Sequence, residues 1–544
     1  MKIPPSQLSL SAALALALAA AGPVACTEGD GFCSDGCDED GADDDGQGDP
    51  EASDDGPRIG RDDAYGTVSS ATGGTNSMGD CADCCDGPHE LGDDTFFMRV
   101  DDSNSFASPL LTRALLPRWD GERPLPVRAH EYLNFYAPRV DAADGVAFAT
   151  NDGAMPIAVG ALNRVFALQV AVRHVPKEEV VGRTIALVID TSPSAAAAVD
   201  ELLGSVDAVF GQVAPSDVIA VYTWATDPEA RIVRPFATVK DRSRELDVVR
   251  SRVQEELARR DEGATLAEPL RDALARTREL VGDATGDGGT VVLVSDGTSG
   301  IDVDTVAYAQ SESDATNPIR IVGVGVGDPL YYSDEVLDLV TDASGGAYLY
   351  FDGSPEARDL LEKRFRELSE TAAVDVRLRV ELPESVTPVT AAGGDVQAGS
   401  SAAVRGQNLG WGGTMTFYEP LEWTGAEGTE CDTLTWHVVR GRDDQAVELD
   451  SGTITVGDVF GGLHQTGSMV QAAAVVAAAD ALRGPTLSRL RLAFTAFEAA
   501  KAYDPDLWEG SSLPALCATL ESACEKKKLD CGSCDFGPSG EEQP

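Results

Sequence analysis

The central part of the chain, residues 183–372, contains short apolar runs that do not alternate with polar residues. Segments with apolar residues at helical spacing separate these runs. Continuous apolar runs are typical of strands buried on both faces of a parallel sheet, whose strands need helical connections. The sequence therefore predicts a doubly wound α/β domain with strands in TIALVID, DVIAVYTW, TVVLVSDG, IRIVGVGVG and AYLYF.

The segments on either side of this domain alternate apolar and polar residues, as strands with one buried face do. Before the domain, one side of residues 164–174 carries Phe166, Leu168, Val170 and Val172. After it, strands are predicted at 374–382, 414–418, 434–439 and 453–456. We therefore predict a β-sandwich-like region into which the α/β domain is inserted. In the strand at 374–382, the residues expected to face inward are Val374, Val376, Leu378, Val380 and Leu382.

Changes in composition indicate the remaining boundaries. Residues 27–93 are rich in Asp, Gly and Ser and have too few apolar side chains to offset the entropy of ordering, so they are predicted to be a disordered acidic tether. After residue 465, apolar residues at helical spacing predict a small α-helical region. The predicted domains are a signal peptide (1–26), the tether (27–93), an N-terminal α/β segment with sandwich strands (94–182), the inserted α/β domain (183–372), further sandwich strands (373–464), the helical region (465–524) and a cysteine-containing tail (525–544).

The N-terminus carries a Lys followed by an Ala- and Leu-rich stretch, which is typical of a secretory signal. Ala25 precedes Cys26 as a small residue precedes the lipidated cysteine of a bacterial lipobox, although Pro23 stands where Leu is usual. Lipidation of Cys26 would anchor the protein to the outer membrane of a cell envelope. The alternative is ordinary cleavage, which gives a secreted or periplasmic protein. No later segment approaches the roughly 20 apolar residues of a membrane span.

The formal net charge of −49 excludes one class of partner. A chain this acidic repels phosphate backbones, so nucleic acid is not expected as a partner. The sequence does not indicate an oligomeric state.

The cysteines favour disulfide bonds. With Cys26 set aside, ten of the eleven cysteines remain, five near each end of the chain, and an even number in an exported chain is typical of disulfides. The CxxC spacing of Cys81 with Cys84 and of Cys531 with Cys534 also suits zinc or redox sites, but only His89 lies near either pair. Since five cysteines cannot all pair locally, either the two ends are bridged or a thiol stays free.

Polar residues follow the predicted parallel strands, where ligands bind in doubly wound folds. Asp190, Ser192 and Ser194 alternate directly after the first strand, a spacing that can turn three side chains toward one point. In a later loop, Thr265 precedes a helix, and Asp296 ends the strand TVVLVSD. Taken singly, each hydroxyl could instead cap its helix and Asp296 could order a turn. Their coincidence at three such positions favours one shared site.

Two carboxylates and three hydroxyls, without histidine or thiolate, make a hard oxygen-donor set. Such a set suits Mg²⁺, or else Mn²⁺ or Ca²⁺. Because few of the donors are anionic, the ion would remain attractive to a carboxylate from outside the chain.

The series Asp190-x-Ser192-x-Ser194, then Thr265, then Asp296 resembles the complete metal-ion-dependent adhesion site of the von Willebrand factor type A domain. The resemblance implies a Rossmann-like doubly wound fold, direct metal contacts from Ser192, Ser194 and Thr265, and contacts through water from Asp190 and Asp296. Pro193 stands where many family members have Gly. Residues 95–108 and 127–138, with the helical region, also look like the flanks of bacterial envelope proteins that carry a central type A domain.

These observations favour a non-enzymatic, metal-dependent protein of the cell envelope, which binds an acidic group of a protein partner. No GxSxG motif is present, and none of the five histidines has an evident nucleophile partner. Two alternatives remain open. The ion could activate water in a metal-dependent hydrolase, or it could only stabilise the loops of a structural envelope protein.

Overall fold

The structure is a computed structural model. It describes residues 95–98, 105–136, 140, 146–157, 164–175, 182–224, 231–259, 266–282, 288–389, 397–398, 404, 406–425, 429–441 and 446–535. The predicted signal peptide and tether, with Cys26, lie outside the described residues, as does Thr265.

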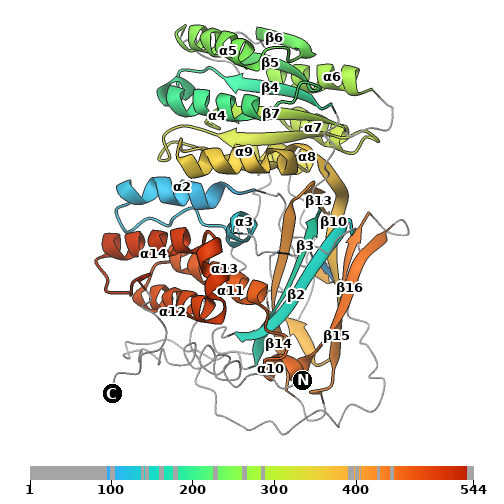
Figure 1. Cartoon of the computed structure of the whole chain (residues 1–544), viewed down its shortest axis with the longest axis vertical. Coiled ribbons are helices and arrows are strands. Elements are labelled where there is room, and N and C mark those ends of the chain that lie inside the picture. Colours follow the sequence, from blue (N-terminus) through green and yellow to red (C-terminus); the bar gives the residue numbers. More distant parts are fainter. Residues whose placement is uncertain are drawn as a thin grey trace, which may run out of the picture.

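The α/β domain is built on a six-stranded sheet with the order β6-β5-β4-β7-β8-β9 (Figure 1). Neighbouring strands are parallel except at the edge, where β6 runs antiparallel to β5. The strands are β4 (Thr184–Asp190), β5 (Val218–Trp224), β6 (Arg231–Thr238), β7 (Gly289–Ser295), β8 (Ile319–Gly325) and β9 (Ala347–Tyr350). The predicted strands are thus all present, and β6 is an additional one.

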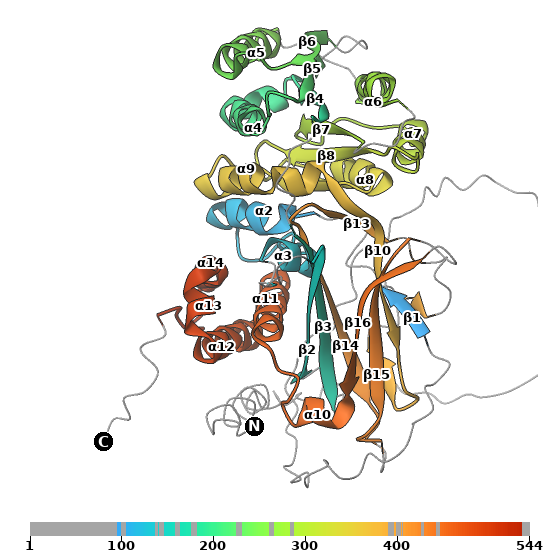
Figure 2. The same cartoon turned by 45° about the vertical axis from the view of Figure 1, so that its right-hand side comes forward.

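Helices cover both faces of this sheet, as Figure 2 shows. One face carries α4 (Val199–Gly211), α5 (Arg242–Leu257) and α9 (Pro355–Ser369), and the other carries α6 (Ala267–Val281), α7 (Val303–Ser313) and α8 (Glu335–Ser344). Because both faces are covered, β4, β7 and β8 are buried almost throughout, as their continuous apolar runs predicted. The doubly wound α/β fold is therefore confirmed.

Two antiparallel sheets form the predicted sandwich, with one apolar core between them. One sheet has the order β12-β1-β10-β15-β16, with β13 also paired to β10, and the other has the order β11-β14-β3-β2. The chain leaves the second sheet after β3, forms the α/β domain and returns through β10 of the first sheet. The elements are β1 (Thr95–Met98), β2 (Phe148–Ile157), β3 (Val165–His174), β10 (Thr371–Glu381), β11 (Val386–Pro388), β12 (Gln397–Ala398), β13 (Gln407–Gly410), β14 (Thr414–Trp423), β15 (Thr433–Arg440), β16 (Val447–Thr455) and a short helix, α10 (Val456–Phe460).

Two details of the strand predictions are wrong. The strand β3 is not half-buried, because its second face, with Ala167, packs against the helical region. In β10 the inward alternation begins only at Val376, and Val374 is 50% exposed. The backbone of Asp375 has a φ of 55°, and the pairing of β10 with β13 shifts register there. This irregularity turns Val374 outward and places Ala373 in the core instead.

The C-terminal region is helical, as predicted, and consists of α11 (Gly467–Arg483), α12 (Leu487–Tyr503), α13 (Pro505–Gly510) and α14 (Leu513–Lys527). It packs against an N-terminal segment that contains α2 (Ala107–Leu115), a short 3₁₀ helix η2 (Leu116–Arg118) and α3 (Ala129–Phe135). The helix α2 lies between the α/β domain and the helical region in Figure 1. Within the described ranges, no helix has the length and apolar content that a membrane crossing requires.

Disulfide bonds pin the end of the helical region. Cys517 pairs with Cys534, and Cys524 pairs with Cys531, so the two cysteines of the second CxxC pair are bound to different partners on α14. Cys431 is disulfide-bonded as well. The disulfide prediction is confirmed for these residues, and the zinc alternative for Cys531 and Cys534 is wrong.

Candidate metal centre

The candidate site lies where the strand order of the α/β sheet reverses. From β4 the chain proceeds to β5 on one side, whereas β7, β8 and β9 follow on the other side. The strands β4 and β7 are parallel neighbours, so their carboxyl ends meet at one edge. Asp190 is the last residue of β4, and Asp296 directly follows β7. Such a switch point is where doubly wound folds bind ligands.

A chain of hydroxyl groups connects the two strand ends. Ser192 Oγ lies 3.0 Å from Ser194 Oγ, which lies 3.1 Å from Thr298 Oγ1. Thr298 Oγ1 donates a hydrogen bond of 2.8 Å to Asp296 Oδ1, and the Thr298 backbone N–H donates to the same oxygen. Since each hydroxyl has one proton, Ser194 donates to Thr298, and Ser192 donates to Ser194. The structure therefore brings Ser192, Ser194 and Asp296 into one network.

Asp190 joins the network through both of its carboxylate oxygens. Oδ1 accepts a hydrogen bond of 2.9 Å from the Ser192 backbone N–H, and Oδ2 accepts one of 2.8 Å from Ser295 Oγ. Ser295 in turn accepts a bond from the Gly297 N–H. These bonds position the loops after β4 and β7 relative to each other.

Ser295 and Thr298 were not among the predicted site residues. A sequence signal for them existed, because Ser295 and Thr298 flank Asp296 and repeat the close polar spacing seen after β4. The buried apolar run of β7 made Ser295 look like part of the strand alone.

The two carboxylates are buried and close enough to repel each other. Asp190 has no measurable exposure and Asp296 is 4% exposed. Burial, and secondly the charge of Asp296, raise the pKa of Asp190 to about 6, against the hydrogen bonds from Ser192 and Ser295 that lower it. No cationic side chain is among the main causes of this shift. The site therefore carries buried negative charge that an added cation would neutralise.

The donor set fits a hard divalent cation. Carboxylates and hydroxyls are the oxygen ligands that Mg²⁺, Mn²⁺ and Ca²⁺ prefer, and the exposed Ser194 and Thr298 lie at the open side of the network. Within the described ranges, no group of three or more His, Cys, Asp or Glu side chains is arranged to hold a metal ion. A cation at this position would thus depend on the hydroxyl groups as much as on the two carboxylates.

The structure does not describe Thr265, so its part in the site stays a prediction. The helix α6, which begins two residues later, packs against β4. Pro193 is exposed at the turn between the two serines, whose hydroxyls nevertheless contact each other. A proline at this position therefore does not prevent the loop from bringing Ser192 and Ser194 together.

The loop after β8 packs against the site. Ser333 N–H donates a hydrogen bond of 3.2 Å to the Asp296 carbonyl. Gly297 makes this approach possible, because its φ is 70° and a Cβ there would lie 1.7 Å from the Ser333 carbonyl oxygen. The same loop carries two exposed apolar side chains, Leu330 and Tyr331, and Val303 is exposed at the start of α7. Exposed apolar residues thus follow the ends of β7 and β8, at the same edge of the sheet as the proposed metal position.

No protein-family model and no curated protein matches the chain. Solved structures do match. A von Willebrand factor type A protein from Catenulispora acidiphila is 14% identical, with 71% of this chain and 89% of that chain covered and a TM-score of 0.39. The ArnB paralog VWA2 from Sulfolobus acidocaldarius is 13% identical, with 70% and 98% covered and a TM-score of 0.36. The manganese-loaded TRAP protein from Plasmodium vivax is 11% identical, with 54% and 97% covered and a TM-score of 0.25. Values this low support no conclusion about activity or partners, and the fold stated above rests on the strand order of this chain.

Proposed function

Since the α/β domain has the doubly wound fold expected of a von Willebrand factor type A domain, we propose that the chain is a metal-dependent binding protein without enzymatic activity. One observation carries the proposal. Two buried carboxylates, Asp190 and Asp296, lie at the switch point of the sheet and are linked by hydroxyl groups, and no cationic side chain of the described residues pairs with either of them.

The residues proposed to hold the cation are Asp190, Ser192, Ser194, Thr265 and Asp296, with Thr298 as an addition from the structure. Mg²⁺ suits this set best, and Mn²⁺ or Ca²⁺ are the alternatives. When bound, the ion supplies an electrophilic centre for a carboxylate of the partner. The protein's own contribution is to keep two carboxylates and the hydroxyls aligned before the partner arrives, through the bonds from Ser295 and the Ser192 N–H.

The surroundings of the site support a protein as the partner. Tyr331 is 77% exposed and Leu330 is exposed as well, both on the loop that follows β8, and Val303 is exposed as the first residue of α7. Exposed aromatic and aliphatic side chains near a polar centre are typical of surfaces that contact proteins. The proposed partner therefore presents an acidic side chain with apolar residues next to it.

We place this protein outside the cytoplasm, at the cell envelope. The disulfides Cys517–Cys534 and Cys524–Cys531 support an oxidising compartment, where such bonds persist. The proposed signal peptide agrees with export, and lipidation of Cys26 would anchor the chain to the outer membrane.

The proposal is tested by metal binding and partner capture with one pair of variants. We expect isothermal titration to show Mg²⁺ or Mn²⁺ binding to the wild type and its loss in Asp190→Ala. Capture of proteins from envelope extract should require the metal and fail both in EDTA and with Asp190→Ala. The control, Asp200→Ala, removes an exposed carboxylate of α4 and should change neither result.

Other outcomes would favour the other functions. Capture that persists in EDTA and in Asp190→Ala contradicts the proposal. A metal that raises the melting temperature without changing capture indicates a purely stabilising ion. Turnover of a phosphoester or peptide that disappears in Asp296→Ala indicates a hydrolase.

A further inference from the structure

The loop between β8 and α8, residues 326–334, packs on the strand end that carries Asp296. The Val326 N–H donates a hydrogen bond of 3.0 Å to the carbonyl of the last residue of β7, and the Ser333 N–H donates one of 3.2 Å to the Asp296 carbonyl. Between these contacts, Gly327 approaches the same aspartate, because a Cβ at this glycine would lie 3.3 Å from the Asp296 Cβ. The position of Asp296 therefore depends on the conformation of this loop.

Two arginines of the N-terminal segment hold the loop. Arg128, the residue before α3, has its Nη2 atom 2.7 Å from Asp334 Oδ2. Arg118, the last residue of η2, has its Nη1 atom 2.6 Å from Asp328 Oδ1. Both arginines precede the α/β domain in sequence and belong to a segment that packs against the helical region. The loop beside the metal centre is thus tied to a part of the molecule outside its own domain.

The geometry of Asp334 indicates that its pairing with Arg128 matters. Asp334 directly precedes α8, a position where an aspartate usually accepts a hydrogen bond from the helix backbone, but its side chain makes no such bond. Asp302, which directly precedes α7, does accept one, of 2.7 Å. The Tyr348 hydroxyl lies 3.4 Å from Asp334 but donates its single proton to Glu131, 3.0 Å away. Asp334 therefore forgoes the usual helix cap and pairs with Arg128.

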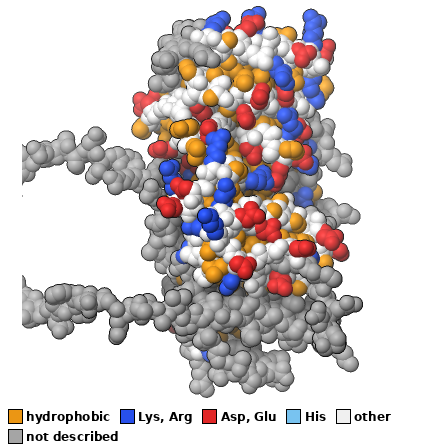
Figure 3. All heavy atoms as spheres, turned by 90° about the vertical axis from the view of Figure 1, so that its left-hand side faces the viewer, with side chains coloured by type: hydrophobic (Ala, Val, Ile, Leu, Met, Phe, Trp, Pro, Cys, Tyr) orange, Lys and Arg blue, Asp and Glu red, His pale blue; other side chains and the backbone are white. Residues whose placement is uncertain are grey.

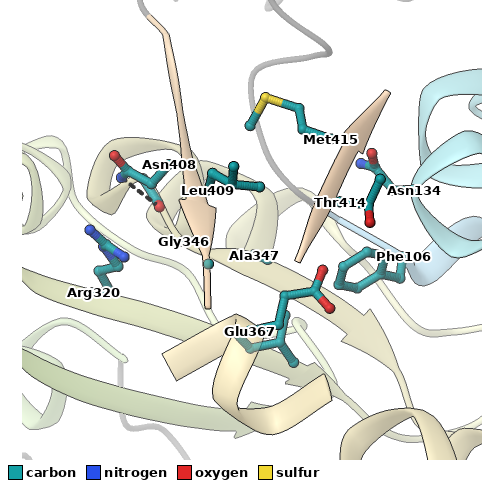
Figure 4. A pocket seen from close by; sticks show the side chains of 13 residues that line it. Phe106, Asn134, Arg320, Gly346, Ala347, Glu367, Asn408, Leu409, Thr414 and Met415 are labelled. Atoms are coloured by element: carbon teal, nitrogen blue, oxygen red, sulfur yellow. Dashed lines mark hydrogen bonds between the residues drawn. The ribbon is translucent and has the colours of Figure 1, made fainter. Parts of the chain in front are cut away.

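Other contacts hold the N-terminal segment on the α/β domain independently of this loop. The Arg364 guanidinium of α9 lies 3.9 Å from the centroid of the Phe106 ring, and its Nη1 donates a bond of 2.9 Å to the Asn134 carbonyl. Figure 4 shows Phe106, Asn134 and Glu367 of α9 around the same small cavity. We therefore expect the segment to stay docked when the pair of Arg128 and Asp334 is removed.

We propose that Arg128 is a positioning residue for the metal centre, which keeps the loop 326–334 against Asp296 by holding Asp334. This inference rests on the proposed function. The side chains of Arg128 and Asp334 are 29% and 23% exposed, whereas those of Arg118 and Asp328 are 52% and 36% exposed. Because water screens an exposed pair more strongly, Arg128 has the larger effect and Arg118 adds a smaller one. The docked N-terminal segment thereby sets the affinity for the cation without touching it.

The test compares two matched variants, Asp334→Asn and Glu356→Gln. Each neutralises a carboxylate of the α/β domain that pairs with an arginine of the N-terminal segment, and the partner of Glu356 is Arg113, which holds α9 and not the loop. In isothermal titration we expect Asp334→Asn to weaken Mg²⁺ binding by roughly tenfold or more, as loss of a group that orients metal ligands does. Glu356→Gln should bind Mg²⁺ as the wild type does.

Arg118→Gln repeats the titration at an exposed position, in case Asp334→Asn does not fold. We expect it to weaken Mg²⁺ binding by about two- to fivefold, because an exposed ion pair contributes less. Its control is Arg123→Gln, since Arg123 lies in the same segment and its ion pair, with Asp120 at 3.6 Å, stays within that segment. This control should leave Mg²⁺ binding unchanged.

Amide hydrogen exchange in EDTA tests the same role without a metal. In Asp334→Asn we expect residues 326–334 to exchange faster than in the wild type, because the hydrogen bond from Ser333 to Asp296 opens more often. In Glu356→Gln the loop should exchange at the wild-type rate. A purely structural pair would lower the melting temperature without this local change.

The outcomes separate this inference from the proposed function. A wild type that binds no Mg²⁺ contradicts the proposed function, and the positioning role with it. A wild type that binds Mg²⁺, together with equal affinity in Asp334→Asn, unchanged exchange of the loop, or equal weakening in Glu356→Gln, overturns the positioning role alone.

Discussion

At the scale of single residues, the candidate metal centre holds two buried like charges, which lower the stability of the folded chain when no cation is bound. Asp190 and Asp296 are buried together, and the pKa of Asp190 is raised to about 6 by burial and by Asp296. In EDTA we expect Asp190→Asn to stabilise the chain by about 1–3 kcal/mol, because it removes one of two like charges. In saturating Mg²⁺ the order should reverse, since only the wild type gains the binding energy.

Thermal unfolding in the two solutions measures this reversal. Asp200→Asn serves as the control, because its carboxylate is exposed on α4. If Asp190→Asn were less stable than the wild type in EDTA as well, the carboxylate would be serving a purely structural role.

Asp480 on α11 gives a prediction about pH. It is 7% exposed, and burial raises its pKa to about 7 although Arg483 and Arg489 lower it. The folded state therefore holds this proton more tightly than the unfolded state, whose Asp pKa is about 3.9. The contribution of this group to stability is full below about pH 4 and is lost as pH rises to about 7.

Asp480→Asn should remove this loss. We expect the variant to exceed the wild type at pH 8 by up to about 4 kcal/mol, and to match it at pH 4. Denaturant unfolding at both pH values measures the difference. A stability difference that does not change between the two pH values would show that Asp480 does not titrate in this range.

The sequence predicted which polar residues lie together where such residues interrupt a buried strand pattern, and their role as metal ligands stays a prediction. Asp190, Ser192, Ser194 and Asp296 are brought together because β4 and β7 are neighbours, which follows from the fold class. Ser295 was missed because it ends the buried apolar run of β7 and so was read as part of the strand alone.

At the scale of elements, the irregularity in β10 decides which valines enter the core. Val374 is 50% exposed, whereas Val376 is fully buried in the sandwich. The two valines are two positions apart, so regular alternation would place them on the same face. We expect Val374→Thr to change the free energy of unfolding by less than about 0.5 kcal/mol. Val376→Thr should cost about 1–3 kcal/mol, because it buries a hydroxyl in the same core.

Chemical denaturation of the two variants compares one substitution at two positions of one strand. Equal losses would contradict the register shift at Asp375.

The sequence predicted which strands and helices form, but not the register of the strands. The parallel strands were recognised from apolar runs because burial on both faces allows no other composition. The edge strand β6 was not predicted, since Pro235 interrupts its apolar residues, and a proline is tolerated there because an edge strand pairs on one side only. Both faces of β3 are buried because the helical region, which is distant in sequence, packs against the second face. The alternation of apolar and polar residues within β3 gives no sign of this contact.

At the scale of the whole molecule, charge is distributed differently in the folded part and in residues 27–93. On the face shown in Figure 3, basic side chains are interspersed with acidic ones, so the described part of that face carries no continuous patch of one sign. The chain as a whole carries −49, and residues 27–93 contribute many of its carboxylates. The net charge of the whole chain therefore bears on its solubility and on the partners that it repels. Charges on this face of the folded part are interspersed with opposite charges instead.

A buried polar cluster joins the N-terminal segment to the α/β domain. Glu131 on α3 has no measurable exposure, and it accepts bonds from Arg128 Nη1 at 2.9 Å and from the Tyr348 hydroxyl of β9 at 3.0 Å. Arg128 also pairs with Asp334, 2.7 Å away, at the start of α8. We expect Glu131→Ala to cost about 3–5 kcal/mol, because it leaves buried partners without their counter-charge.

Calorimetry should also show whether this cluster couples the parts of the molecule. In Glu131→Ala we expect the α/β domain to unfold in a separate transition from the remainder, and the control Glu122→Ala, an exposed carboxylate of the same segment, to leave the profile unchanged. A wild-type profile in the Glu131 variant would contradict this assignment.

The insertion of the α/β domain has a mechanical consequence. The domain is attached at two points, through β3 and through β10, and these strands belong to opposite sheets of the sandwich. A partner held at the metal centre and pulled away would exert tension on both covalent connections at once. The pull would be divided between the two sheets, and neither sheet would have to be peeled apart alone for the attachment to hold.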